Sequence, residues 1–393
     1  MPAIQAIDEK RALDHLMKLL ALPGPSGGEA KVSEYVRNAL IKAGYPKSGI
    51  KNDKAHKKIG RGFEIGNLIA KLPGRGSKKK DPRLLFMGHM DTVPLCKGAV
   101  PLRKGKRIVS KGNTALGGDN RTSIGALLAL AETLAACDLP HPPITLLCTV
   151  GEENGLFGAL HVNVKDLGNP AMGFNVDSDI PGQIVIGAIG ADRWEVDVRG
   201  ISSHAGVHPD HGVSATLIAS RAIADVSERG YFGKITVGRG GASNIGTIQG
   251  GEATNQVTDH IFIKGESRSH NKAFLGKITK EYEKAFQRAA KSVRNHKGKP
   301  GKIEFRSERD YDAFRMSKNA PPVKFAAAAA KRLGLPVSTL IADGGIDASY
   351  LNSKGVPTVT LGAGQHAAHT VDEYIEIREY LDGCQLLTEI ALG

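Results

Sequence analysis

Four short apolar segments constrain the fold of this chain more than any other feature. Each is too short for a typical buried helix and has the length and composition of a buried strand. They occupy residues 67–70, 84–87, 144–150 and 172–176. A helical stripe at residues 124–134 separates the second from the third. Short apolar strands that alternate with helices predict an α/β fold, in which a mainly parallel sheet is flanked by helices.

Two helices are predicted ahead of this sheet. Apolar residues recur with helical spacing over residues 7–22. The second helix is predicted to begin at Ser26, because Ser26 and Glu29 have the spacing of a capping box.

The pattern of apolar and polar residues changes near Gly187. Residues 194–198 alternate between apolar and polar, as in a half-exposed strand, and a β-α-β-β-α-β order follows. A helix at 318–334 and a buried strand at 357–361 then resume the first pattern. We therefore predict a main domain in two parts, residues 1–187 and 311–393, with an α+β domain inserted at residues 188–310.

Composition and charge place this chain among ordinary globular proteins. Of its 393 residues, 41% are hydrophobic and 24% are charged. The formal net charge of +13 raises nucleic acid as a partner. The basic runs at 97–111 and 288–302 contain no aromatic residues, however, which favours solvated surface charge over nucleic-acid binding.

Nothing in the sequence predicts export or a membrane partner. No apolar run approaches the roughly 20 residues of a membrane span. Charges from Asp8 onward interrupt the region where a signal peptide needs an apolar stretch. The four cysteines are scattered, as in proteins of a reducing compartment. We therefore expect a cytoplasmic protein.

Polar residues of metal-ligand type follow the predicted strands. His89 and Asp91 lie two positions apart after the strand at 84–87, so their side chains face the same way. One can bind a metal while the other orients it, although a histidine with an ordinary structural hydrogen bond is the commoner interpretation of such a pair. Other such residues follow the later strands or open the helix at 124–134: Asp119, Glu152, Glu153, Asp177, Asp179, His366 and His369.

Each of these positions also has a structural interpretation. Asp119 is either a helix N-cap or a carboxylate that bridges two cations. Adjacent carboxylates at Glu152 and Glu153 are costly at a buried strand end unless a cation compensates them. The carboxyl ends of strands meet at one edge of an α/β sheet, so these groups can converge there.

The mixture of imidazole and carboxylate suits zinc, with cobalt and manganese as alternatives. A shared aspartate indicates a two-metal hydrolase. The sequence has no G-x-S-x-G elbow, Walker loop or H-E-x-x-H helix, so the corresponding enzyme classes have little support.

At this point the motifs resemble a known family. The series GHMDTVP, LGGDNRTSIGALLAL, TVGEENGLFGA, NVDSD, GISSHAGVHPDHGVSA and HAAHTVDEYI is similar to the two-zinc peptidase family of peptidase T, carboxypeptidase G and aminoacylase, and most of all to its peptidase T-like branch. The resemblance covers nearly the whole chain in order. It implies a zinc-exopeptidase-like fold whose inserted domain is a lid that commonly mediates dimer formation, so we expect a homodimer.

The resemblance also implies a role for each site residue. Two zinc ions per subunit would be bound, one by His89, Asp119 and Asp177 and the other by Asp119, Glu153 and His369. Asp179 and His366 remain competitors for the places of Asp177 and His369. Glu152 matches the general base, Asp91 the carboxylate that orients His89, and His204 a lid histidine that stabilises the tetrahedral intermediate, often from the partner subunit.

The remaining matches concern substrate binding. Asn255 and Arg268 match lid residues that contact substrate, although Arg268 has the alternative of an ion pair with Glu266. Three further residues match the loop that lines the pocket: Gly344, Gly345 and Asp347.

The activity that we expect is a dinuclear zinc aminopeptidase acting on short peptides. Asp347 on one side, and Arg268 with Asn255 on the other, offer groups for both ends of a short substrate, which favours tripeptides. A related zinc amidase, such as an N-acyl amino acid deacylase or a carboxypeptidase, is the alternative. A third hypothesis is a protein without catalysis that binds polyanions through its basic surface, which the complete ligand set disfavours.

Overall fold

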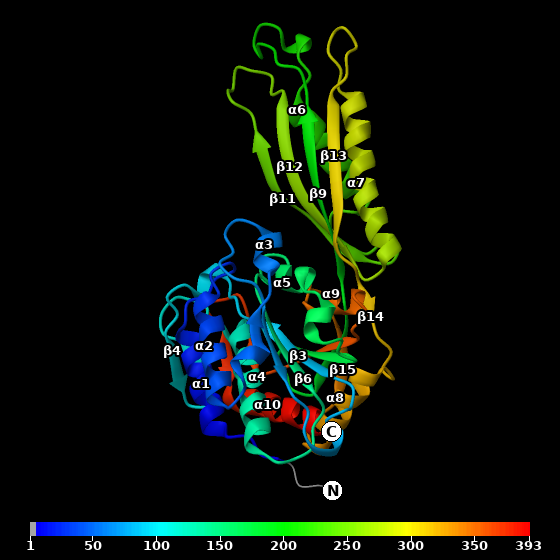
Figure 1. Cartoon of the computed structure of the whole chain (residues 1–393). Coiled ribbons are helices and arrows are strands. Elements are labelled where there is room, and N and C mark those ends of the chain that lie inside the picture. The colour runs from blue at the N-terminus through cyan, green and yellow to red at the C-terminus, as the bar shows by residue number, and fades with distance from the viewer. Residues whose placement is uncertain (1–4) are drawn as a thin grey trace. The chain divides into compact units, whose positions relative to one another are not determined.

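The computed structural model describes residues 5–393 and divides the chain into two compact units (Figure 1). Residues 1–4, which the predicted first domain includes, lie outside the described residues. The first unit comprises the described chain up to Gly187 together with Arg315–Ala342 and Ile346–Gly393. The second comprises Ala188–Phe314 and Asp343–Gly345, whereas the sequence analysis placed the insertion at residues 188–310.

The first unit is built on a mixed sheet. Its strands follow the order β1 (Ile50–Asn52), β2 (Leu68–Leu72), β6 (Ile144–Thr149), β3 (Leu84–His89), β7 (Met172–Val176), β16 (Thr358–Leu361), β8 (Gln183–Ala188) and β14 (Phe314–Arg315), with β15 (Ser338–Ala342) also paired to β8. The four central strands β6, β3, β7 and β16 run parallel. Strand β1 pairs with β2, β2 with β6, and β8 with β16 in the antiparallel sense. The α/β fold is confirmed, and the sheet is mixed rather than wholly parallel.

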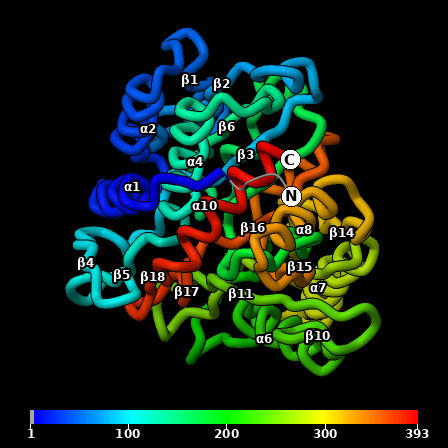
Figure 2. The backbone as a smooth tube through the Cα atoms, turned by 90° about the horizontal axis from the view of Figure 1, so that it is seen from below, coloured from blue at the N-terminus to red at the C-terminus, as the bar shows by residue number. Residues whose placement is uncertain are grey.

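Helices cover this sheet. Figure 2 shows α1 (Glu9–Ala21) and α10 (Ile377–Leu392) beside α4 (Gly118–Ala136), and both pack against it. Helix α4 is apolar and buried around most of its circumference, as expected for a helix inside a core. The other helices of the unit are α2 (Ala30–Lys42), α3 (Ala55–Ile59), α5 (Phe157–His161), α8 (Pro321–Arg332) and α9 (Ala348–Ser353).

The predicted capping box at Ser26 is wrong. Helix α2 begins at Ala30, and no side chain caps its N-terminus. The Ser26 hydroxyl donates to Asp91 Oδ2 at 2.6 Å. Glu29 Oε1 accepts the N–H groups of Gly27 at 2.9 Å and Gly151 at 3.0 Å. Both polar side chains therefore brace loops that follow β3 and β6, and these long-range partners replace the local cap.

A small antiparallel sheet lies beside the main one in the first unit. Its order is β17 (Gln365–His366), β18 (Tyr374–Glu376), β5 (Arg107–Ser110) and β4 (Pro101–Lys104). The basic run at 97–111 therefore contains a hairpin, and its cations at Arg103, Lys104, Lys106 and Arg107 are exposed. The sheet also joins this hairpin to the loop that carries His369.

The second unit is an antiparallel sheet with helices packed on it. The strand order is β10 (Gly233–Ile235), β11 (Gly241–Gly250), β12 (His260–Ser269), β9 (Gly190–Arg199) and β13 (Lys302–Tyr311). Helices α6 (Ala215–Glu228) and α7 (Lys272–Ser292) contact each other and the sheet (Figure 1). Trp194 is buried against Tyr282, with ring centroids 4.4 Å apart. The predicted β-α-β-β-α-β order is present, with β10 added at one edge.

No helix within residues 5–393 combines the length and apolar character that crossing a membrane would require.

Candidate metal centre

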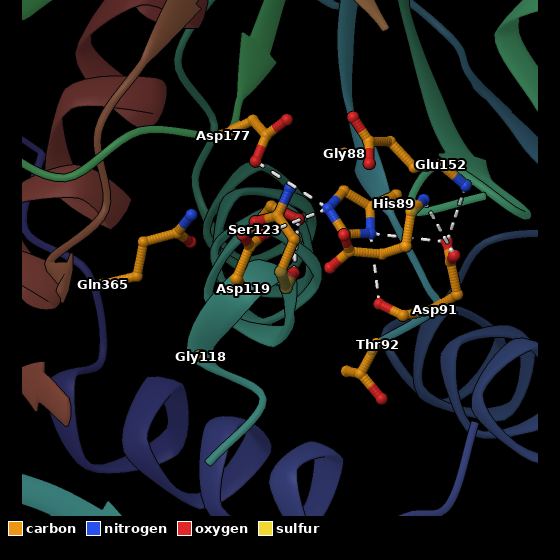
Figure 3. Close-up of polar contacts among 12 residues, drawn as sticks. Gly88, His89, Asp91, Thr92, Gly118, Asp119, Ser123, Glu152, Asp177 and Gln365 are labelled. Atoms are coloured by element: carbon orange, nitrogen blue, oxygen red, sulfur yellow. Dashed lines mark hydrogen bonds and ion pairs between the residues drawn. The ribbon is translucent and has the colours of Figure 1, made fainter. Parts of the chain in front are cut away.

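His89 ends β3 with its imidazole buried at the carboxyl edge of the sheet (Figure 3). Its Nδ1 lies 3.1 Å from the carbonyl oxygen of Asp91 and 3.4 Å from Asp91 Oδ1. Its Nε2 lies 3.1 Å from Asp119 Oδ1 and 3.8 Å from Asp177 Oδ1. A proton on Nδ1 that is shared with Asp91 leaves the Nε2 lone pair for a metal, as is usual for ligating histidines.

Asp91 is fixed by the loop that follows β6. Its Oδ1 accepts the backbone N–H of Glu152 at 3.1 Å, and its Oδ2 accepts that of Glu153 at 3.2 Å. Burial alone would raise the pKa of Asp91, but the hydrogen bond and positive charge of His89, together with the hydrogen bonds from Ser26 and Glu152, outweigh burial and lower the pKa. Asp91 therefore remains an anion that orients His89.

Asp119 lies at the entrance to α4, with non-helical backbone angles, after Gly117 in the left-handed conformation (φ 83°). Gly117 occupies the N-cap position and no side chain caps the helix. Asp119 Oδ1 faces His89, and Oδ2 lies 3.4 Å from His369 Nε2. Burial raises the pKa of Asp119, but its hydrogen bonds with His369 and His89 lower it overall. The carboxylate spans two imidazoles, which is the geometry of a bridging ligand.

Glu373 supports this turn and was not identified from the sequence. Its Oε2 accepts the N–H groups of Leu116 at 2.7 Å and Gly117 at 2.8 Å, and its Oε1 accepts that of Asp119 at 2.9 Å. The side chain is buried. The sequence offered little signal, because Glu373 stands next to Asp372 in a polar stretch that follows His369.

The adjacent glutamates after β6 diverge. Glu153 Oε2 lies 2.9 Å from His369 Nε2. Glu152 instead belongs to a group with His89 and Asp177 whose ligand atoms all lie within 4.8 Å of one another. Burial raises the pKa of Glu152 well above its ordinary value, and the negative charge of Asp177 adds to this effect. Glu152 therefore has the higher proton affinity that a general base needs.

The structure distinguishes the competing ligands. Asp177 directly follows β7 and lies beside His89 and Glu152, whereas Asp179 belongs to none of the candidate metal groups among residues 5–393. His366 pairs with Glu379 at 2.5 Å, away from the cluster. His369 faces Asp119 and Glu153 instead. Of the competing residues, Asp177 and His369 are thus the ones that lie in the cluster.

This donor set fits two divalent cations. Four carboxylates, those of Asp119, Glu152, Glu153 and Asp177, surround two imidazoles. Burial lowers the pKa of His89, but Glu152 and Asp119 raise it well above its usual value. Hydrogen bonds with Asp119 and Glu153 raise the pKa of His369 to about 10. The same negative charge favours cations between these side chains, since cations would displace the protons.

Two predicted residues of the second unit lie on adjacent loops. The N–H of Ala205 donates to the carbonyl oxygen of Asn255 at 2.8 Å. His204 Nδ1 accepts the N–H groups of Gly206 and Val207, each at 3.2 Å. Because Nδ1 accepts, the neutral ring carries its proton on Nε2 and can donate it to a substrate oxygen. The side chains of His204 and Asn255 are both exposed.

Arg268 forms the ion pair that the sequence analysis held as an alternative. Its Nε and Nη2 lie 2.9 and 3.2 Å from the carboxylate oxygens of Glu266. Burial lowers the pKa of Arg268, but Glu266 raises it overall. Substrate binding by Arg268 stays a prediction. In that role the Arg268 guanidinium would have to contact the substrate and Glu266 at the same time.

The predicted pocket loop is divided between the units. Gly344 and Gly345 belong to the second, and a side chain at Gly345 would meet the Tyr311 ring at 2.5 Å, so only glycine fits there. Asp347 belongs to the first and is buried, with Oδ2 accepting from the Thr149 hydroxyl. Burial raises the pKa of Asp347 to about 6.

Comparisons with known proteins find relatives that match over most of the chain. The model of "Peptidase family M20/M25/M40" matches residues 85–393. The solved aminopeptidase PepT from Bacillus cereus is 30% identical, covers 98% of both chains and gives a TM-score of 0.85. A tripeptidase from Staphylococcus aureus is also 30% identical over 98% of both chains, with a TM-score of 0.87. The uncharacterised protein YqjE of Bacillus subtilis is 29% identical over 385 residues, 98% of each chain.

Proposed function

The chain belongs to peptidase family M20/M25/M40, and we propose that it is a dinuclear zinc aminopeptidase that removes the N-terminal residue of short peptides, chiefly tripeptides. The observation that carries this proposal is the Asp119 carboxylate, whose two oxygens face His89 and His369 at 3.1 and 3.4 Å. The names of the two relatives that are 30% identical support the peptide substrate.

In this proposal one ion is bound by His89, Asp119 and Asp177, and the other by Asp119, Glu153 and His369. Two zinc ions, when bound, lower the pKa of a water molecule and polarise the scissile carbonyl group. The nitrogen–oxygen separations of 2.9 to 3.8 Å among these side chains are compatible with shared coordination.

The residues of the chain divide the proton transfers between them. Glu152 accepts a proton from the attacking water and returns it to the leaving amine, since burial keeps its proton affinity high. Asp91 holds His89 in one orientation through Nδ1. His204 donates from Nε2 to the developing oxyanion, which is the state that most needs a donor.

The role of His204 requires the second unit to close over the substrate of its own or a partner subunit. We propose a homodimer formed through the second unit. The substrate is a short peptide, and the cytoplasm is the proposed compartment, because Cys96, Cys137, Cys148 and Cys384 are all free.

One observation favours the related zinc amidase as a second candidate. Arg268 is engaged by Glu266, and Asp347 is buried against Thr149, so neither predicted contact to a substrate terminus is freely offered. An amidase that binds the acyl group of its substrate instead of a free amine would not need Arg268 or Asp347 to contact a substrate terminus.

The discriminating experiment compares a free tripeptide with its N-acetylated and C-amidated forms on zinc-loaded protein. An aminopeptidase loses most of its kcat/KM on acetylation and less on amidation. If the acetylated peptide is cleaved as well as the free one, or better, the amidase replaces the aminopeptidase. A salt-dependent DNA-binding assay on the same preparation tests the polyanion-binding hypothesis.

A further inference from the structure

A second group of metal-ligand side chains lies in the second unit. Asp210, His211 and His296 each offer one ligand atom, and these atoms lie within 4.8 Å of one another. None of the three belongs to the candidate centre described above. We propose that they form a separate site for a transition-metal cation, of which Zn²⁺, Cu²⁺ and Ni²⁺ are the chemical class.

The backbone holds the two segments of this site together. Asp210 and His211 end the 3-10 turn η5 (Pro209–His211), and His296 lies in the turn that follows α7. The N–H of His296 donates to the carbonyl oxygen of Asp210 at 2.8 Å. The side-chain amide of Asn295 donates to the carbonyl oxygen of His211 at 3.2 Å. The three positions are therefore fixed relative to one another, although the side chains are exposed.

The histidine rings form a stack. The ring centroids of His208 and His211 are 4.6 Å apart with planes at 9°, and those of His211 and His296 are 4.2 Å apart with planes at 29°. His296 Nδ1 lies 3.3 Å from the carbonyl oxygen of Asp210, which leaves its Nε2 for a cation.

The donor types select the class of metal. Two imidazoles and one carboxylate suit Zn²⁺, Cu²⁺ or Ni²⁺, whereas Mg²⁺ and Ca²⁺ prefer oxygen ligands alone. Zinc–nitrogen bonds of about 2.0–2.1 Å place neighbouring tetrahedral ligands about 3.3 Å apart, so the exposed side chains need to close by about 1.5 Å at most. The cations Arg294, Lys297 and Lys299 near the site oppose binding weakly, because solvent and salt screen exposed charges.

This site lies on the same loop as His204. The N–H of His208 donates to the carbonyl oxygen of His204 at 2.9 Å, and the Ser203 hydroxyl donates to the carbonyl oxygen of His208. A bound cation would therefore stiffen the segment that presents His204. That consequence rests on the proposed function, whereas the site itself does not.

The test counts metal ions on the full-length protein equilibrated with buffered Zn²⁺, by mass spectrometry and calorimetry. We expect His211→Ala and His296→Gln each to bind one ion fewer than wild type, or to bind it at least about tenfold more weakly. The matched control is His260→Ala, a half-buried histidine of the same unit that pairs with Asp197 at 2.8 Å. Asp119→Asn should lose ions of the candidate centre and keep this one.

Two results would overturn the proposal. One is an equal number of ions, with equal affinity, on wild type and His211→Ala. The other is a loss in His260→Ala as large as that in His211→Ala, which would mean unspecific adsorption to surface histidines. Cu²⁺ added to protein with a zinc-loaded centre gives a second readout, because its electron paramagnetic resonance spectrum should show nitrogen ligands in wild type that His211→Ala loses.

Discussion

Glu373 accepts the backbone N–H of Asp119 at 2.9 Å. Through the N–H groups of Leu116 and Gly117 it fixes the whole turn that presents the proposed bridging carboxylate, although it contacts no ligand atom itself. The centre therefore depends on a residue 254 positions away along the chain.

We predict that Glu373→Gln weakens metal binding by about 10–100-fold, because partners of this kind orient the ligand and an amide retains only one good acceptor. Glu373→Ala should lose more, since three buried N–H groups would then lack a partner. Zinc affinity by competition with a chelator measures the effect. Glu376→Gln, which alters an exposed pair with Arg107, is the control. Equal affinities in Glu373→Gln and wild type would contradict the role.

Glu152→Gln should retain its metal ions and lose most of its turnover, because the general base is removed while the ligand Glu153 stays. General-base removal typically lowers kcat by about 10²–10⁴-fold. The paired variant Glu153→Gln should instead lose metal affinity, since Glu153 contacts His369 at 2.9 Å. Metal content and kcat measured on both variants separate the two roles. A Glu152→Gln protein with near wild-type kcat and full metal content would show the assignment to be wrong.

His204→Ala should lower kcat and leave metal content unchanged. His204 Nδ1 accepts the N–H groups of Gly206 and Val207, so the Nε2–H of His204 is free to donate to the substrate. Loss of one oxyanion donor typically costs about 10²–10³-fold in kcat. Steady-state kinetics beside the control His260→Ala make the measurement. An unchanged kcat would remove His204 from the mechanism.

The α/β class and the sheet edge where these side chains meet were predictable from the sequence. Runs such as 84–87 are continuous and apolar, and polar residues follow directly, so His89 and Asp119 could be placed near each other without coordinates. Parallel strands bring their carboxyl ends to one edge, which makes this step reliable.

The sequence pattern could not decide between Asp177 and Asp179, or between His366 and His369, as members of the site. His369 reaches the cluster from a turn in which Ala367 and His369 both have positive φ, of 52° and 64°. An alanine or a histidine in the sequence does not indicate a positive φ, because that conformation is usual only for glycine. For a related reason Glu373 was not identified from the sequence, and Glu29 was assigned only to a capping box. They accept backbone N–H groups of distant loops, and such contacts leave no spacing signal in the sequence.

Glu29 predicts a dependence of stability on pH. Burial raises its pKa from 4.5 to about 7, and the negative charge of Asp91 adds to this effect. Between these values the folded state binds more protons than the unfolded state, so the contribution of Glu29 to stability is full below about pH 4.5 and falls as the pH rises to 7. The loss is of the order of 3 kcal/mol.

Glu29→Gln removes this penalty while keeping an acceptor for Gly151. Its Tm relative to wild type should therefore rise between pH 5 and pH 8, measured on chelated protein so that bound cations do not shift the titration. Glu34→Gln, an exposed change on α2, serves as the control. A constant difference in Tm across this range would contradict the prediction.

Asp347 gives the last prediction, which concerns the pH dependence of activity. Burial is the main cause of the raised pKa of Glu152, and the negative charges of Asp177 and Asp347 add to it. Asp347→Asn removes one of these charges and keeps an acceptor for the Thr149 hydroxyl, so the pKa of Glu152 should fall. The acid limb of kcat/KM should then move to lower pH, because the base is deprotonated earlier, while metal content stays the same. Asp343→Asn, a change at a side chain that is 91% exposed, is the matched control. If the acid limb stays in place at full metal content, Asp347 does not tune Glu152, and its substrate-binding role becomes the one to test by the change in KM.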